Sequence, residues 1–233
     1  MHRLDWSVDQ DGYKIIELEG ERGLYSGSEP YDGMVRYIVQ KGGPKKEYSP
    51  MLQNAAIHRE LAMLDQSKSG DEEVLSFCGK YGLLEHEMKY GPYTGSGFNY
   101  GFRVHPQLGP MPINHIMSIE YFWHLQEQVQ SVVAHLDRND KRAAVHSFNT
   151  QWIQSIMQLE HNPRSGKYSY INAPINLNAA IWLLIEQEIS GERSWLRCQN
   201  CQTWFIPKTK RAVYCRQACK VAWHRKLKQA QNT

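Results

Sequence analysis

The sequence predicts a mainly helical α+β body over residues 1–192, followed by a small basic module over residues 193–233. Three observations predict this division. Apolar residues recur at helical spacing along much of the body, and short runs rich in β-branched and aromatic residues fall near its beginning. Four of the five cysteines lie in the C-terminal module. We therefore expect a helical body with a short β element, and a module whose chemistry depends on its cysteines.

The composition is that of a folded protein. The 233 residues are 41% hydrophobic and 22% charged, which excludes a disordered chain. The longest strongly apolar run, Ala179–Ile185, is too short to span a bilayer. The first residues carry charges and lack the apolar stretch that a secretory signal peptide contains. We expect a cytoplasmic protein that does not insert in a membrane.

The overall charge of +3 conceals an asymmetry. All 24 acidic residues lie at or before Glu192, so the body carries a formal charge of −7. The C-terminal module has ten Lys and Arg residues and no acid, which gives it +10. A charge asymmetry of this kind indicates an acidic body joined to a separate basic module at its end.

The first part of the body predicts two strands and two helices. Tyr13–Leu18 and Val35–Gln40 are short and rich in β-branched and aromatic residues. Ser49 followed by Pro50 favours a helix start, which predicts a helix over Met51–Leu64. A second helix is expected from Asp71, where acids occupy the first turn, to Gly82.

Later segments predict longer helices. Ser118–Leu136 and Lys141–Glu160 both place apolar residues three and four apart, and the short link between them predicts a helical hairpin. A polar turn over His161–Tyr170 precedes a helix over Leu177–Ser190, with Asn176 as its cap and Gly191 at its end. Between the early and late helices, Tyr90–Pro112 is rich in Gly and Pro and is expected to be irregular. Its aromatic residues either form a binding surface or fix the loop to the body: Tyr90, Tyr93, Phe98, Tyr100 and Phe102.

The cysteines of the C-terminal module have the spacing of a metal site. Cys198-x2-Cys201 allows two thiolates to bind one ion from a tight turn, and Cys215-x3-Cys219 places two more on one face of a helix. Four thiolates in a tetrahedron select Zn²⁺ and leave no open position, so we expect a structural zinc ion. A disulfide pair, a redox site and an iron–sulfur cluster are the alternatives, and His224 is a spare ligand. Cys78, on a helical face, is expected to be a buried apolar residue.

The order of residues around these cysteines resembles treble-clef zinc fingers. Cys198-x2-Cys201 is followed by Phe205-Ile206-Pro207, basic residues, and Tyr214-Cys215-x3-Cys219 leading into a basic helix. The pattern is most similar to the CGNR-type finger at the C-terminus of bacterial proteins that carry an ABATE domain. Those proteins are regarded as stress-linked transcription regulators, so the resemblance implies DNA binding. The family's Cys-Gly-Asn-Arg reads Cys219-Lys220-Val221-Ala222 here.

The basic residues of the module suggest a nucleic-acid interface. Such residues contact phosphates without reading sequence, whereas forked donors read bases. Arg216, Arg225 and Gln217 are the candidates for base contacts. We predict a bacterial or phage regulator that binds nucleic acid, with duplex DNA as the favoured ligand. The residues predicted to contact it are Lys208, Lys210, Arg211, Arg216, Lys220, Arg225 and Lys228.

Two other functions remain open from the sequence. The module could be a structural, zinc-bound tail that docks on the acidic body or serves as a protein–protein adaptor, with a partner or a second copy bound through the helical body. A treble-clef nuclease is the third interpretation, but the module has no acid to hold a hydrolytic metal. Two candidate patches in the body, Glu120/His124/Glu127 and Glu85-His86-Glu87, are more typical of solvated surface. The sequence leaves enzyme activity open and favours a non-catalytic role.

Overall fold

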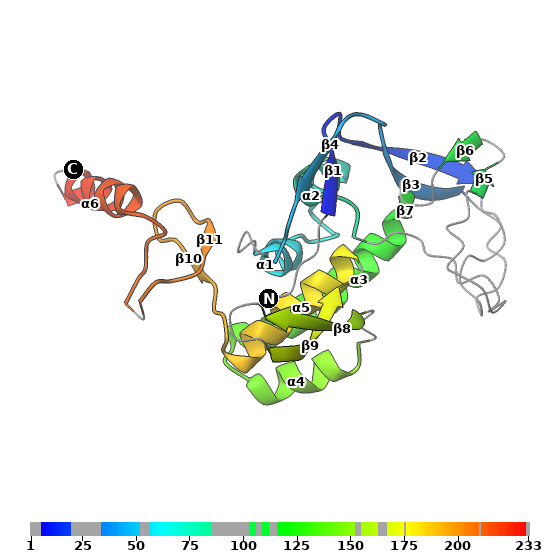
Figure 1. Ribbon diagram of the computed structural model, residues 1–233. Coiled ribbons are helices and arrows are strands. Elements are labelled where there is room, and N and C mark those ends of the chain that lie inside the picture. Colours follow the sequence, from blue (N-terminus) through cyan, green and yellow to red (C-terminus); the bar gives the residue numbers. More distant parts are fainter. Residues whose placement is uncertain are drawn as a thin grey trace.

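The structure, a computed structural model, combines helices and strands (Figure 1). It describes residues 6–19, 34–51, 56–84, 103–105, 109–111, 116–151, 155–162, 167–174, 176–209 and 211–231. The helices are α1 (Ile57–Ala62), α2 (Asp71–Tyr81), α3 (Ile119–Asp137), α4 (Lys141–Asn149), α5 (Leu177–Ser190) and α6 (Gln217–Gln231). The strands are β1 (Trp6–Asp9), β2 (Tyr13–Glu19), β3 (Met34–Gln40), β4 (Lys45–Tyr48), β5 (Arg103–His105), β6 (Gly109–Met111), β7 (Ile116–Ser118), β8 (Ser155–Asn162), β9 (Lys167–Pro174), β10 (Leu196–Arg197) and β11 (Trp204–Phe205).

The two predicted strands are confirmed, and they pair with each other in the N-terminal β structure. β2 pairs antiparallel with β3 over their full length, and β7 adds a third strand on the other side of β3. The sequence did not predict β1 and β4, which make a separate antiparallel pair. The buried Asp9 carboxylate connects the two pairs, because it accepts hydrogen bonds from the backbone of Asp11 and of Gly42 (2.7 Å).

Three of the predicted helices are confirmed. In α2, one face is buried and Gly82 ends the helix with φ +88°; the buried residues are Val74, Phe77, Cys78 and Tyr81. In α3, the Ser118 hydroxyl accepts the Tyr121 amide at the first turn. In α5, the Asn176 side chain accepts the Ala179 amide and Gly191 adopts the left-handed conformation. These helices supply the fully buried centre of the core: Phe122, Leu125, Ile181, Trp182 and Leu184.

The predicted helix over Lys141–Glu160 is wrong beyond its first half. α4 ends at Asn149, and β8 begins at Ser155 and pairs along eight residues with β9. The predicted polar turn over His161–Tyr170 therefore lies partly within this hairpin. Helical spacing in one segment cannot reveal a partner strand that follows it, and here the complete ladder satisfies the backbone in place of helical hydrogen bonds.

The predicted helix start at Ser49 is also wrong. α1 begins at Ile57, with Ala56 at its cap. Met51 lies in a turn, is buried, and its carbonyl accepts a hydrogen bond from Arg193 (3.2 Å). At this position, where the sequence predicted a helix, the backbone carbonyl therefore accepts a hydrogen bond from a side chain distant in the sequence.

The Gly- and Pro-rich segment is only partly described. β5 and β6 form a short antiparallel pair within it. The five aromatic residues named above lie outside the described residues. The body thus carries more strand than the sequence predicted.

The C-terminal elements β10, β11 and α6 lie to one side of the body, and α6 points away from it (Figure 1). Among the described residues, no helix combines the length and apolar character needed to cross a membrane.

Candidate metal centre

The first two cysteines lie in a tight turn between two short strands. β10 pairs with β11, and the Cys198 amide donates to the Thr203 carbonyl (3.0 Å). The Gln202 amide donates to the Cys198 carbonyl (2.9 Å), and Gln202 has φ +59°. This closed turn holds the side chains of Cys198 and Cys201 on one side.

The second pair lies at the start of α6. Cys215 precedes the helix and Cys219 lies in its first turn, where its amide donates to the Arg216 carbonyl (3.1 Å). The Gln199 amide donates to the Val213 carbonyl (3.1 Å), which joins the β10–β11 turn to the segment before α6. This contact brings the two cysteine pairs together.

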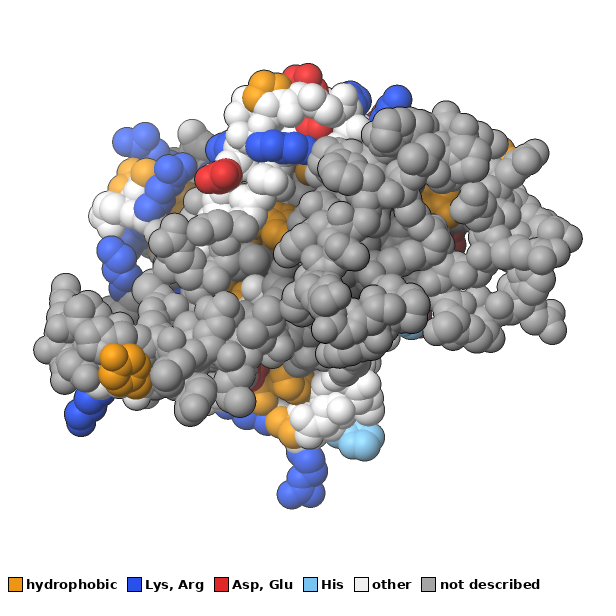
Figure 2. All heavy atoms as spheres, turned by 45° about the vertical axis from the view of Figure 1, so that its right-hand side comes forward, with side chains coloured by type: hydrophobic (Ala, Val, Ile, Leu, Met, Phe, Trp, Pro, Cys, Tyr) orange, Lys and Arg blue, Asp and Glu red, His pale blue; other side chains and the backbone are white. Residues whose placement is uncertain are grey.

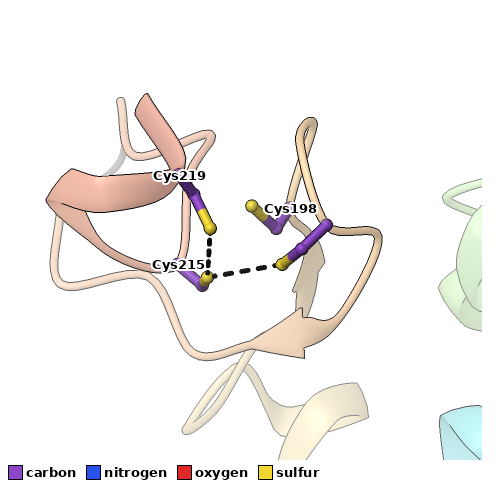
Figure 3. Close-up of side chains that lie close together, drawn as sticks. Cys198, Cys215 and Cys219 are labelled. Atoms are coloured by element: carbon purple, nitrogen blue, oxygen red, sulfur yellow. Dashed lines mark hydrogen bonds between the residues drawn. The ribbon is translucent and has the colours of Figure 1, made fainter. Parts of the chain in front are cut away.

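The four sulfur atoms converge on one point (Figure 3). All four lie within 4.8 Å of one another, and the Sγ atom of Cys215 lies 3.6 Å from that of Cys201 and 3.5 Å from that of Cys219. Sulfur atoms bound to one zinc ion at about 2.3 Å in a tetrahedron lie about 3.8 Å apart. A disulfide needs about 2.05 Å, so the four cysteines are free thiols here. The cluster could therefore hold a metal ion.

The environments of the four thiols differ. Hydrogen bonds from the side chain and backbone of Thr203 lower the pKa of Cys201 to about 6. Burial and the neighbouring thiols raise the pKa of Cys215 to about 12. The thiolate is the form that binds metal, so a cation at the centre would stabilise the charged form that burial disfavours in Cys215.

The other candidate ligands are not brought together in the described residues. There, no further group of three or more His, Cys, Asp or Glu side chains is close enough to hold a metal. His124 instead contacts Gln128 (2.9 Å), and the His224 ring lies 6.3 Å from that of Tyr214. Cys78 is fully buried in the body, as predicted, and burial raises its pKa. Glu85, His86 and Glu87 lie outside the described residues.

The predicted nucleic-acid-binding residues are exposed wherever they are described. Lys210 lies outside the described residues. The others are Lys208, Arg211, Arg216, Lys220, Arg225 and Lys228. Arg216 differs from the rest because its side chain hydrogen-bonds to Cys219, which raises the pKa of the guanidinium. Arg216 therefore borders the cysteine cluster, and its contact with bases stays a prediction.

Apart from Lys226, which lies on the same side of α6 as Cys219 two turns further along, the remaining cations of α6 lie away from the cysteines. With 3.6 residues per turn, Gln217, His224 and Lys228 lie on the side of the helix opposite Cys219. Lys220 and Arg225 lie at the two flanks of that side. Across the face of the protein seen in Figure 2, Lys and Arg side chains project from the surface. Among the described residues, no ion pair joins a Lys or Arg of the C-terminal module to an acid of the body.

A buried ionic cluster that the sequence analysis missed lies where the module meets the body. Arg59 is 4% exposed and hydrogen-bonds through three of its nitrogens to Glu188 and Asp137. His58 is fully buried, and its Nε2 lies 2.9 Å from Glu188 Oε2. The signal was Glu188 itself, an acid on the same helical stripe as Ile181 and Leu184.

Acid is expected to destabilise the body through His58. Burial, the largest effect, lowers the pKa of His58 although Glu188 opposes this. The unfolded chain therefore takes up a proton near pH 6.5 before the folded chain does. The stability that neutral His58 contributes is complete above about pH 6.5 and is lost below it, by up to about 1.4 kcal/mol per pH unit.

Urea unfolding at about pH 7.5 and about pH 5.5 checks this prediction. We expect His58→Gln to reduce the pH dependence of the unfolding free energy, because Gln does not titrate. The exposed residue His146 is the control, and His146→Gln should leave the pH dependence unchanged. Equal pH dependence in the wild type and His58→Gln would show that His58 does not carry the effect.

No protein-family model matches this sequence, and no curated protein matches it either. The function proposed below therefore depends on the residues and their geometry.

Proposed function

We propose that the C-terminal module is a zinc-stabilised treble-clef finger that binds nucleic acid, with duplex DNA as the proposed ligand. The protein would then be a bacterial or phage regulator. The observation that carries the proposal is the exposed cationic side of α6, which lies opposite the cysteine cluster and forms no ion pair with the body among the described residues.

Zinc is the metal that this donor set favours. Four thiolates are soft ligands, and a set of four closes the tetrahedron that zinc prefers. The order of a hairpin with one cysteine pair, followed by a helix with the second pair, supports the treble-clef assignment. Such a site would be structural, because no ligand position remains for a substrate. The neighbouring cations would offset the charge of −2 left on a zinc ion bound by four thiolates.

The binding face suits a polyanion. Lys220 and Arg225 flank a strip on which Gln217, Val221 and His224 face solvent or lie near it, so cations would meet the backbone while the strip meets the bases. An α-helix fits the major groove of B-DNA. The module has no acid that would repel phosphate.

A protein–protein adaptor is the second candidate function. Its support is a set of apolar side chains that the C-terminal module leaves exposed, each 38–44%: Leu196, Val213, Val221 and Leu227. A partner that covers them would bind largely through apolar contact, so its affinity would change little with salt. Nucleic-acid binding would instead weaken steeply with salt.

Fluorescence anisotropy with a labelled mixed-sequence duplex tests the proposal. We expect the full chain, loaded with stoichiometric zinc, to bind the duplex at low salt and to be displaced by unlabelled duplex more readily than by polyglutamate of equal charge. Displacement by polyglutamate at equal charge would indicate a general polyanion site. No binding at low salt would contradict the proposal and favour the adaptor.

A further inference from the structure

Besides the hydrogen bond from Arg193 to Met51, two tryptophans of the C-terminal module contact the body, and we call this tryptophan contact the joint. On the module side are Trp195 and Trp204. On the body side are His58, Arg59 and Met63, all from α1 or the residue after it. None of the described lysines of the module takes part, so the joint differs from the electrostatic docking that the charge asymmetry suggested.

Arg59 is the centre of the joint. Its Nε and both terminal nitrogens are engaged by Glu188 and Asp137, so hydrogen bonding occupies the edge of the guanidinium. The flat face of the guanidinium is left for another kind of contact. The ring of Trp204 lies over it, with 5.1 Å from Cζ to the ring centroid. Such a contact contributes more when the cation is desolvated, and Arg59 is almost fully buried.

Two further contacts place the module on α1. The Nε1 atom of Trp204 lies 3.4 Å from the Sδ atom of Met63. The ring of Trp195, which is 3% exposed, meets the ring of His58 edge-on at 4.7 Å. Residues of the module and of the body that are more than 130 positions apart in the chain therefore contact each other in the joint.

Closing the joint buries two polar atoms. His58 Nδ1 and Trp195 Nε1 are buried and have no hydrogen-bond partner among the described residues. Burial costs free energy, because each of these atoms loses its hydrogen bond to water. Opening the joint would return both atoms to water.

The position of Trp204 depends on the cysteine cluster. Trp204 lies in β11, three residues after Cys201, and pairs with Arg197, the residue before Cys198. The guanidinium of Arg197 also lies 5.8 Å from the ring of Trp204. A strand pair of two residues each is too short to persist without the metal that would fix the turn between them.

We propose that the joint couples metal occupancy of the cysteine cluster to the stability of α1 and of the ionic cluster beneath it. The proposal rests on the metal binding proposed above. When the metal leaves, the β10–β11 turn opens, Trp204 leaves Arg59, and water reaches the buried pair of Arg59 and Glu188. Thermodynamic linkage makes the coupling reciprocal, so weakening the joint from the body side lowers the affinity of the cysteines for metal by the same factor.

Hydrogen exchange of the full chain, with and without a zinc chelator, tests the coupling. In the wild type we expect chelation to raise exchange of the α1 amides about tenfold or more. In Trp204→Ala, exchange of α1 should already be raised with zinc bound and should change little on chelation. Trp204→Phe, which keeps an aromatic ring over Arg59, should restore most of the difference. Leu227→Ala, at an exposed apolar position of α6, is the control and should behave as the wild type.

Met63→Ala tests the reciprocal effect with a substitution in the body that leaves every residue of the module unchanged. We expect it to weaken zinc binding about threefold or more in a chelator competition, although Met63 is 138 positions from Cys201. If the wild type loses zinc and α1 exchange is unchanged, the joint does not couple the two and the proposal is overturned, while the metal site stands. If the purified chain binds no metal at all, the proposed zinc site itself fails.

Discussion

Replacing Cys215 by Ser is expected to release the metal and unfold the C-terminal module. Cys215 lies between Cys201 and Cys219, and its sulfur is within 3.6 Å of both. The module has few buried side chains of its own, chiefly Cys198, Cys219 and Trp195. In small modules of this kind the free energy of zinc binding, about 10–16 kcal/mol in isolated fingers, is the free energy of folding. The hydroxyl of Ser is a poor replacement for a thiolate ligand.

Zinc content by atomic spectroscopy, together with amide chemical shifts of residues 196–231, measures this effect. We expect zinc to fall from one ion per chain to nearly none, and the shifts of the module to collapse to those of an unfolded chain. Cys78→Ser is the matched control, because Cys78 is the cysteine that lies in the body core. It should reduce stability of the body and leave zinc unchanged. A Cys215→Ser variant with full zinc and native shifts would contradict the assignment.

Reversing the charge of Lys220 and Arg225 together is expected to weaken duplex binding by about 100-fold or more near 0.1 M salt. Both side chains are exposed on α6, and they flank the side opposite Cys219. Each phosphate contact that is lost reduces the magnitude of the negative slope of log affinity against log salt by about 0.9. The loss of two contacts should therefore make this slope shallower by about 2. Neither residue belongs to the cysteine cluster, so zinc content should not change.

A control with the same change in net charge separates the site from the overall field. Lys46→Glu combined with Arg142→Glu reverses one Lys and one Arg at exposed positions of the body. We expect this control to lower the affinity only slightly, because salt screens distant charges. Equal losses in both variants would mean that net charge, and not α6, determines binding.

The sequence predicted those elements whose signals are local. Asn176 and Gly191 bound α5 as their capping preferences indicate, and the acids at Asp71–Glu73 mark the start of α2. The cysteine cluster was found in the same way, because its four ligands lie within a short stretch and their spacing reflects a turn and a helix. Local signals of this kind do not need the rest of the chain.

The failures have the opposite origin. Residues 155–162 follow a helix and keep an apolar spacing that suits one, but their structure is set by pairing with residues 167–174. The dipeptides Asn162-Pro163 and Ser165-Gly166, both turn formers, were the available signal for a hairpin. The joint was missed for a similar reason. Arg59 and Trp204 are both unremarkable in sequence, and their contact exists only after the body has folded.

The salt dependence of duplex binding by the zinc-loaded full chain tests the central claim most directly. We expect binding at low salt and a log–log slope of about −4 or steeper, since several exposed cations of α6 and its preceding segment would neutralise phosphates. Removing zinc with a chelator should abolish this binding, and adding zinc back should restore it. A slope near zero, or binding that is unchanged after zinc has been removed, would contradict the claim that a metal-stabilised α6 binds nucleic acid.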